Sequence, residues 1–123
     1  MNTLNRVVLL VSFFVIASCG GGGGGGGSED SYTPPAQTNG APSITNTVFN
    51  ISVQENQTSA FTISASDPDG DSLTYSLSGT DSALLSVSSS GVVTFNTAPD
   101  YENPSDSNAD NVYGVTATVS DGS

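Results

Sequence analysis

The 123-residue sequence lacks histidine and tryptophan and has one cysteine and one basic residue, Arg6. Without histidine, the chain has no Ser–His or Cys–His nucleophile pair and no imidazole metal site. A single cysteine can form neither an internal disulfide nor a thiolate zinc site. A lone arginine excludes the basic surface that binds nucleic acid. Most catalytic side chains and all soft-ligand metal sites are therefore missing, and the length suffices for one small domain.

Carboxylates, in contrast, are abundant. Twelve Asp and Glu residues give a formal net charge of −11 at pH 7, and all of them follow residue 19. So anionic a chain repels itself, and its carboxylates have almost no cationic partners within the sequence. Oxygen ligands of this kind suit calcium or magnesium. The composition therefore predicts that divalent cations neutralise part of the charge.

The first 19 residues have the pattern of a secretory signal peptide. A short segment with Arg6 precedes an apolar run from residue 7 to residue 17. Eleven residues in a helix span about 16 Å, roughly half of a bilayer core, so we expect a signal helix and not a permanent transmembrane helix.

The junction Ile16-Ala17-Ser18-Cys19 resembles the lipobox of bacterial lipoproteins, which are cleaved before the cysteine and lipidated on its thiol. The resemblance implies that residues 1–18 are a lipoprotein signal peptide and that Cys19 carries the lipid. It also implies a place in the bacterial cell envelope, at the outer membrane because Gly20 follows the cysteine. An ordinary signal peptide with an incidental cysteine is the alternative.

An unbroken run of glycine, Gly20–Gly27, follows, and then a stretch rich in Pro, Thr and Asn up to Gly40. Glycine-rich sequence behaves as a flexible coil. We therefore expect residues 19–40 to be a lipidated cysteine and a disordered linker that joins the membrane to a domain beginning at residue 41.

From residue 41 onwards, apolar residues alternate with hydroxyl-bearing ones in short segments. Such alternation places the apolar side chains on one face of a strand. The segments are 49–53, 61–65, 73–77, 85–87, 93–95 and 113–119. Turn residues such as Pro68-Asp69-Gly70 separate them. Six or seven short strands predict an all-β, antiparallel sandwich over residues 41–123.

Acidic residues gather in the predicted turns. Three lie within Asp67-Pro68-Asp69-Gly70-Asp71, Glu55 follows the first strand, and Asp100 and Glu102 share one loop. Carboxylates this close repel one another unless a cation intervenes, and calcium commonly takes oxygens from separate loops. The spacing excludes an EF-hand, because a glycine stands three positions after Asp67 instead of five.

Five motifs together resemble the cadherin repeat in its bacterial form. In chain order they are Ala41-Pro42-Ser43-Ile44, Val53-Gln54-Glu55-Asn56, Ala65-Ser66-Asp67-Pro68-Asp69, Gly91-Val92-Val93 with Asp100-Tyr101-Glu102, and residues 113–122. The resemblance implies a Greek-key, immunoglobulin-like β-sandwich of cadherin type that binds Ca²⁺ at both ends.

The same resemblance assigns the ligands. It places Glu55, Asp100 and Glu102 at the end shared with a following repeat, and Asp67, Asp69 and Asp121 at the end facing the preceding linker. Asp71 stays outside this set. Because the last strand of the family follows the Asp-Gly turn, we expect the chain to be a fragment whose last strand is missing. An open sheet edge would then lie beside Val115 and Val119.

Together these features predict a calcium-binding, lipid-anchored surface module for adhesion or spacing, and not an enzyme. Its expected partners are the membrane, through Cys19, and neighbouring cadherin-like repeats or a like protein on another cell. Nucleic acid and small-molecule substrates are not expected. The alternative is a metal-free, immunoglobulin-like spacer that presents a downstream binding or catalytic domain. Glycoside hydrolysis is not expected, because residues two apart on an exposed loop, such as Asp100 and Glu102, do not flank a cleft.

Overall fold

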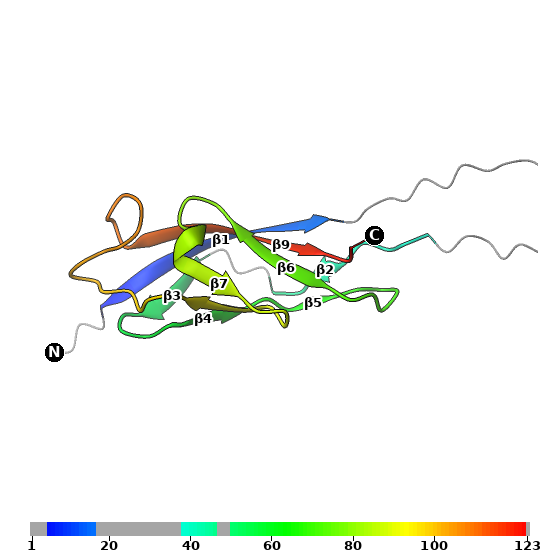
Figure 1. Ribbon diagram of the computed structural model, residues 1–123, viewed down its shortest axis with the longest axis horizontal. Coiled ribbons are helices and arrows are strands. Elements are labelled where there is room, and N and C mark those ends of the chain that lie inside the picture. The colour runs from blue at the N-terminus through cyan, green and yellow to red at the C-terminus, as the bar shows by residue number, and fades with distance from the viewer. Residues whose placement is uncertain (1–4, 17–37, 47–49, 123) are drawn as a thin grey trace, which may run out of the picture.

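The computed structural model describes residues 5–16, 38–46 and 50–122 (Figure 1). Cys19, the glycine run and Phe49 lie outside the described residues. The elements in chain order are β1 (Arg6–Ile16), β2 (Ser43–Ile44), β3 (Asn50–Gln54), β4 (Ser59–Thr62), β5 (Ala65–Ser66), β6 (Thr74–Ser78), the 3-10 helix η1 (Ser82–Leu84), β7 (Leu85–Val87), β8 (Val92–Phe95) and β9 (Val112–Ser120). Within these residues, no helix has the length and apolar character needed to cross a membrane.

The strands form two facing layers. One sheet has the order β3-β1-β9-β6, a second has the order β4-β8-β7, and β2 pairs with β5. Aromatic rings join the layers: Phe95 of β8 packs edge-on against Tyr113 of β9 with ring centroids 5.1 Å apart, and Phe13 of β1 meets Phe61 of β4 at 6.5 Å. The predicted all-β sandwich is confirmed.

Strand β9 shows why the alternating pattern predicted this fold. Tyr113, Val115, Ala117 and Val119 are at most 4% exposed, and the residues between them are half-buried. Because successive side chains of a strand point to opposite faces, one face of β9 lies in the core. The buried apolar core comprises Val7, Leu9, Val11, Val53, Ile63, Leu85, Val93, Phe95 and these four residues of β9.

The apolar run near the N-terminus is not the signal helix that the sequence predicted, but strand β1. This strand lies between β3 and β9, antiparallel to the first and parallel to the second. Its valines and phenylalanines favour the pleated conformation, and its inward side chains Val7, Leu9 and Val11 are buried in the core. The helix was expected because residues 1–19 have the pattern of a signal peptide, and a short apolar run has no period that would separate helix from strand.

Two further expectations fail with it. The edge of β9 that we expected to be open is covered by β1, and Val115 and Val119 are 4% and 0% exposed. The sheet is also mixed and not wholly antiparallel, because β1 and β9 run parallel.

The predicted strand over residues 61–65 is divided between two pairings. β4 pairs with β8, whereas β5 pairs with β2. Between them, the side chain of Asn46 takes the place of a strand neighbour: Nδ2 donates to the carbonyl oxygen of Thr62 at 2.6 Å, and Oδ1 accepts from the amide of Ser64 at 2.7 Å. The chain can therefore change partners without leaving these two backbone groups unpaired.

Candidate metal centres at the two ends of the sandwich

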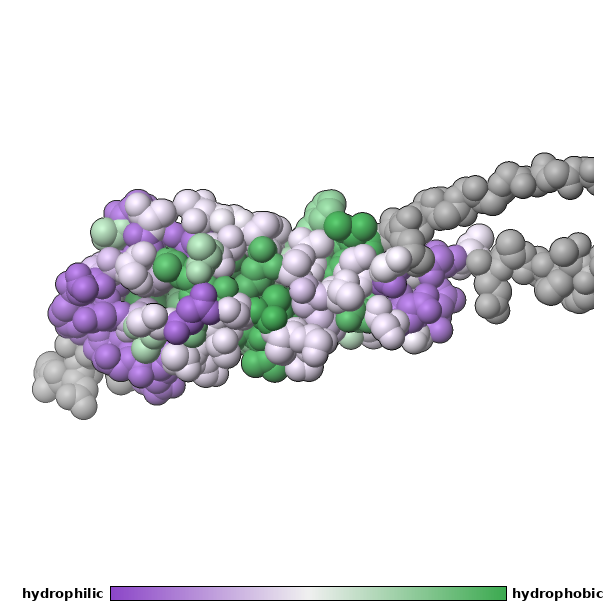
Figure 2. Space-filling view, in the orientation of Figure 1, coloured by the Kyte–Doolittle hydropathy of each residue, from purple (hydrophilic) through white to green (hydrophobic). Residues whose placement is uncertain are grey.

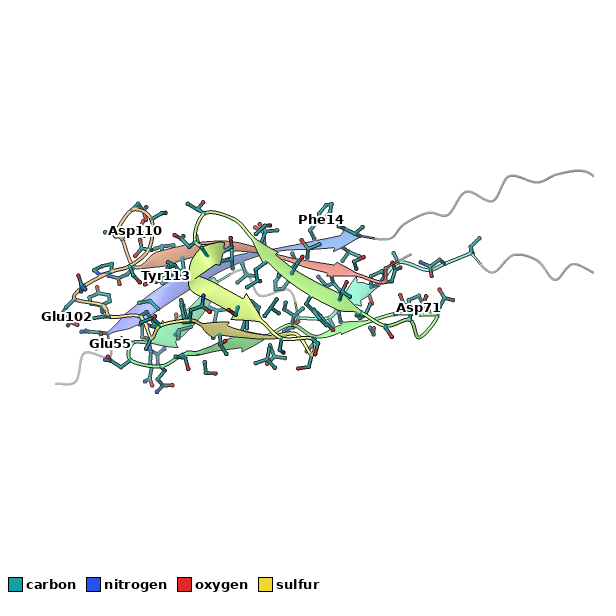
Figure 3. All side chains as sticks on the ribbon, viewed as in Figure 1. Phe14, Glu55, Asp71, Glu102, Asp110 and Tyr113 are labelled. Atoms are coloured by element: carbon teal, nitrogen blue, oxygen red, sulfur yellow. The ribbon has the colours of Figure 1, made fainter. Side chains whose placement is uncertain are left out.

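Glu55, Asp100 and Glu102 meet at one end of the sandwich (Figure 3), and their carboxylate oxygens lie within 4.8 Å of one another. Glu55 follows β3, and the other two belong to the loop after β8. Backbone contacts hold these segments together, since the amide of Asn56 donates to the carbonyl oxygen of Pro99 at 2.8 Å. Asn56 has a φ of 62°, a left-handed conformation that asparagine adopts more readily than most residues. The structure thus brings together the three residues expected at this end.

The hydrogen bonds of this first group fix its carboxylates without neutralising their charge. The amide of Tyr101 donates to Oε2 of Glu55 at 3.0 Å, and the amide of Glu102 donates to Oδ1 of Asp100 at 3.0 Å. Asn5 donates from its side chain to Oε1 of Glu102. All of these donors are neutral, so the negative charges of the three carboxylates lie close together. Glu55 is half-buried, and Asp100 and Glu102 are exposed.

At the opposite end, the loop between β5 and β6 gathers Asp67, Asp69 and Asp71, whose carboxylate oxygens also lie within 4.8 Å of one another. Figure 3 places Asp71 at the far end of the molecule from Glu55 and Glu102. Oδ1 of Asp67 accepts from the amides of Asp69 at 2.8 Å and Asp71 at 3.2 Å, which curls the loop around it. Oδ2 of Asp67 is buried and accepts no hydrogen bond. A buried carboxylate oxygen without a donor is costly, and a bound cation would satisfy it.

Asp121 was expected beside Asp67 and Asp69, but it lies outside this group of three, and Asp71 takes its place there. Asp121 is 8% exposed, and its Oδ2 accepts from Nδ2 of Asn39 at 2.7 Å. The next residue, Gly40, donates its amide to Oδ2 of Asp69 at 2.6 Å. The segment that leads into β2 therefore contacts both acids with neutral donors.

Two buried aspartates outside the expected set have structural roles. Asp81, 4% exposed, accepts from the amide of Ser107 at 2.8 Å and from that of Gly114 at 2.7 Å. Asp106, 6% exposed, accepts from the amides of Asp110 and Asn111. In the sequence, Gly114 could have indicated that a group such as Asp81 packs here, because a glycine inside a strand often marks the close approach of another group.

A pocket lies between η1 and the end of β8. Its volume is about 370 Å³, and it is lined by Ala83, Leu84, Phe95, Asn96, Thr97 and Ser105. None of these side chains is a carboxylate, and both acidic groups lie on the surface at the ends, where Figure 2 shows hydrophilic residues gathered. The two acidic groups offer oxygen ligands for cations, and neither group contributes a residue to this pocket.

The sequence model of a family described as a bacterial Ig domain matches residues 39–123. No curated protein and no solved structure matches the chain. The matched residues include β2 to β9 and both acidic groups, but not β1.

Proposed function

Because the chain belongs to the bacterial Ig domain family, whose members are generally structural or adhesion-type modules without enzymatic activity, we propose that it is a calcium-stiffened surface module. In this proposal Ca²⁺ binds at both ends of the sandwich and fixes the loops there. The module then holds a neighbouring repeat in place or contacts a like protein on another cell.

The observation that carries the calcium proposal is the convergence of three carboxylates at each end. The chain has twelve acids and a single basic side chain, so nearly all of its carboxylates have no basic side chain to pair with. Glu55 reaches the first site from one loop and Asp100 and Glu102 from another, which is the arrangement calcium uses to join loops. At the second site the unpartnered Oδ2 of Asp67 is a ligand atom without a donor.

The resemblance to the cadherin repeat supports the same proposal, because it identified five of the six acids in these two groups from the sequence. The exception is Asp71, which the loop geometry adds. Asp121 contacts Asn39 instead, and we propose that it holds the segment before β2 against the second site.

We further propose that Cys19 is lipidated and anchors the module at the outer membrane. The support is the sequence Ile16-Ala17-Ser18-Cys19 at the end of an apolar run. The glycine run that follows would then space the module from the membrane.

The test is thermal unfolding of the protein in EDTA, in Ca²⁺ and in Mg²⁺. We expect Ca²⁺ at 100 times its dissociation constant to stabilise the fold by about 2.7 kcal/mol per site, because it binds only the folded chain.

The double variant Asp100→Asn/Glu102→Gln removes the first site. The matched control, Glu29→Gln/Asp30→Asn, removes the same two charges from the predicted linker. Loss of part of the calcium effect in the first variant alone supports the proposal. No shift with Ca²⁺, or equal loss in both variants, contradicts it.

A metal-free spacer is the second candidate, and one observation favours it. The loop amides of Asp69 and Asp71 already donate to Oδ1 of Asp67, so this loop is ordered by its own hydrogen bonds. A protein that melts at the same temperature in EDTA and in Ca²⁺ would be such a spacer, presenting a downstream binding or catalytic domain.

A further inference from the structure

Asn39 is the one asparagine of the sequence that a glycine follows. A backbone nitrogen can attack the side-chain carbonyl carbon of the preceding asparagine, and glycine allows this approach most readily because it has no Cβ atom to obstruct it. Asn39 and Gly40 precede β2 and lie outside any strand, with Asn39 exposed and Gly40 half-buried. Water therefore reaches the side chain at which this reaction takes place.

Two carboxylates hold the nitrogen atoms that take part in this reaction. Nδ2 of Asn39, the nitrogen that leaves, donates to Oδ2 of Asp121 at 2.7 Å. The amide of Gly40, the nitrogen that attacks, donates to Oδ2 of Asp69 at 2.6 Å. Hydrogen bonds to ionised acceptors are stronger than those between neutral groups. Because the Gly40 nitrogen has to leave Asp69 and move onto Cγ of Asn39, the fold slows the reaction without preventing it.

The backbone of Gly40 is tightly packed against the loop between β5 and β6. A Cβ atom at Gly40 would lie 2.5 Å from Cγ of Pro68 and 3.1 Å from Oδ2 of Asp69. Reaction at Asn39 can leave the backbone running through its side chain, which inserts one methylene group and displaces the next residue. A displaced Gly40 cannot keep both its packing against Pro68 and its hydrogen bond to Asp69.

We propose that Asn39 is a site of spontaneous deamidation in the folded chain, and that Asp69 and Asp121 set its rate. The Gly40 nitrogen loses its proton to water and bonds to Cγ of Asn39, the bond from Cγ to Nδ2 breaks, and Nδ2 leaves as ammonia. Water then opens the cyclic imide. Opening at Cγ of residue 39 leaves isoaspartate or aspartate according to which of the two carbonyl–nitrogen bonds breaks: the bond to Cγ gives aspartate, and the bond to the backbone carbonyl carbon gives isoaspartate.

The product loosens the segment before β2. Both forms place a carboxylate where Nδ2 of Asn39 donated, against Asp121, which is 8% exposed. Two carboxylates this close repel each other, and burial of one of them strengthens the repulsion. Deamidation therefore replaces a hydrogen bond with repulsion and weakens the hold of residues 38–40 on the second acidic group. The proposal does not depend on calcium, and its test is made in EDTA.

The experiment incubates the full, folded chain in EDTA at neutral pH over several weeks and follows each asparagine by peptide-mapping mass spectrometry. Asn108 is the internal comparison. It is also exposed and donates to a carboxylate, Oδ2 of Asp110 at 2.8 Å, but alanine follows it. We expect aspartate and isoaspartate to accumulate at Asn39 well before they appear at Asn108. No conversion at Asn39, or equal conversion at both residues, would overturn the proposal.

Two variants separate the restraint by Asp69 from the loss of a charge. Asp69→Ala and Asp71→Ala each remove one carboxylate from the same loop, but the Gly40 amide donates to Asp69. We expect Asp69→Ala to raise the rate at Asn39 about tenfold, because a hydrogen bond to an ionised acceptor no longer holds the attacking nitrogen. Asp71→Ala should leave the rate nearly unchanged. Equal rates in the two variants would overturn the role of Asp69.

The consequence for stability is tested with the product itself. Asn39→Asp should lower the melting temperature in EDTA by a few degrees, because it places a carboxylate against the buried Asp121. The matched control is Asn108→Asp, which also turns a donor to a carboxylate into an acid, but beside the exposed Asp110. It should lower the melting temperature less. Equal shifts for the two variants would show that the contact with Asp121 is not what deamidation disrupts.

Discussion

Gly91 lies in the turn between β7 and β8, where the backbone passes close to the segment between β4 and β5 and to β6. It has a φ of 81°, and a Cβ atom there would lie 2.7 Å from the carbonyl oxygen of Ile63 and 3.2 Å from the ring of Tyr75. Its carbonyl oxygen also accepts from the amide of Ile63 at 2.8 Å. Neither the conformation nor the space therefore admits a side chain.

Comparison with Gly70 separates these two effects. Gly70 has nearly the same φ, 80°, but a Cβ atom there would meet nothing within 4 Å. We expect Gly70→Ala to cost about 1 kcal/mol of unfolding free energy, through the left-handed conformation alone. Gly91→Ala should cost about 3 kcal/mol, because the clash with backbone adds to this. Urea unfolding in EDTA measures both, and equal losses would show that the close approach at Gly91 is absent.

Some of the acidic residues at the two ends were predicted from the sequence, and others were not. Glu55, Asp100 and Glu102 were predicted as one group from their resemblance to cadherin motifs, and their carboxylate oxygens lie within 4.8 Å of one another in the structure. The choice between Asp71 and Asp121 was not predictable. It depends on how the loop curls when Oδ1 of Asp67 accepts from two backbone amides.

Among the elements, most segments with strict alternation were predicted correctly as strands, but the segment 61–65 is divided between β4 and β5. The uniformly apolar run was predicted wrongly. β9, with hydroxyl-bearing residues between its apolar ones, has a period that only a strand explains. The run in β1 is apolar at nearly every position, so its pattern fits a helix and a strand equally well. Its pairing with both β3 and β9 decides between them, and such long-range pairing is invisible in local sequence.

The junction between β4 and β5 gives a prediction at this scale. Asn46 pairs with both Thr62 and Ser64, so Asn46→Ala leaves the amide of Ser64 without its protein acceptor. We expect the hydrogen exchange of this amide to become at least about tenfold faster, with a stability loss of about 1 kcal/mol because water replaces the lost partner. The control is Ser43→Ala, which removes only exposed contacts of 3.4 Å to Ser66. If both variants leave exchange at Ser64 unchanged, Asn46 does not join the two strands.

For the stability of the whole molecule, the distribution of negative charge matters more than any single pair of charged residues. The formal net charge is −11, and hydrophilic residues gather at the two ends of the sandwich (Figure 2). Three carboxylates within 4.8 Å at each end repel one another in the folded chain more than in the extended chain, where they lie farther apart. The folded state should therefore be destabilised when neither salt nor divalent cations screen this repulsion.

We accordingly expect the melting temperature in EDTA to rise by a few degrees as NaCl increases from about 10 mM to about 500 mM, because the Debye length falls from about 30 Å to below 5 Å. The double variant Asp69→Asn/Asp71→Asn reduces the repulsion at one end, so its melting temperature should depend less on salt. Glu29→Gln/Asp30→Asn changes the net charge equally but leaves both ends intact, and its salt dependence should match that of the parent. Calorimetry at several salt concentrations measures all three proteins. Equal slopes for both variants would show that the net charge, and not its concentration at the ends, sets the response to salt.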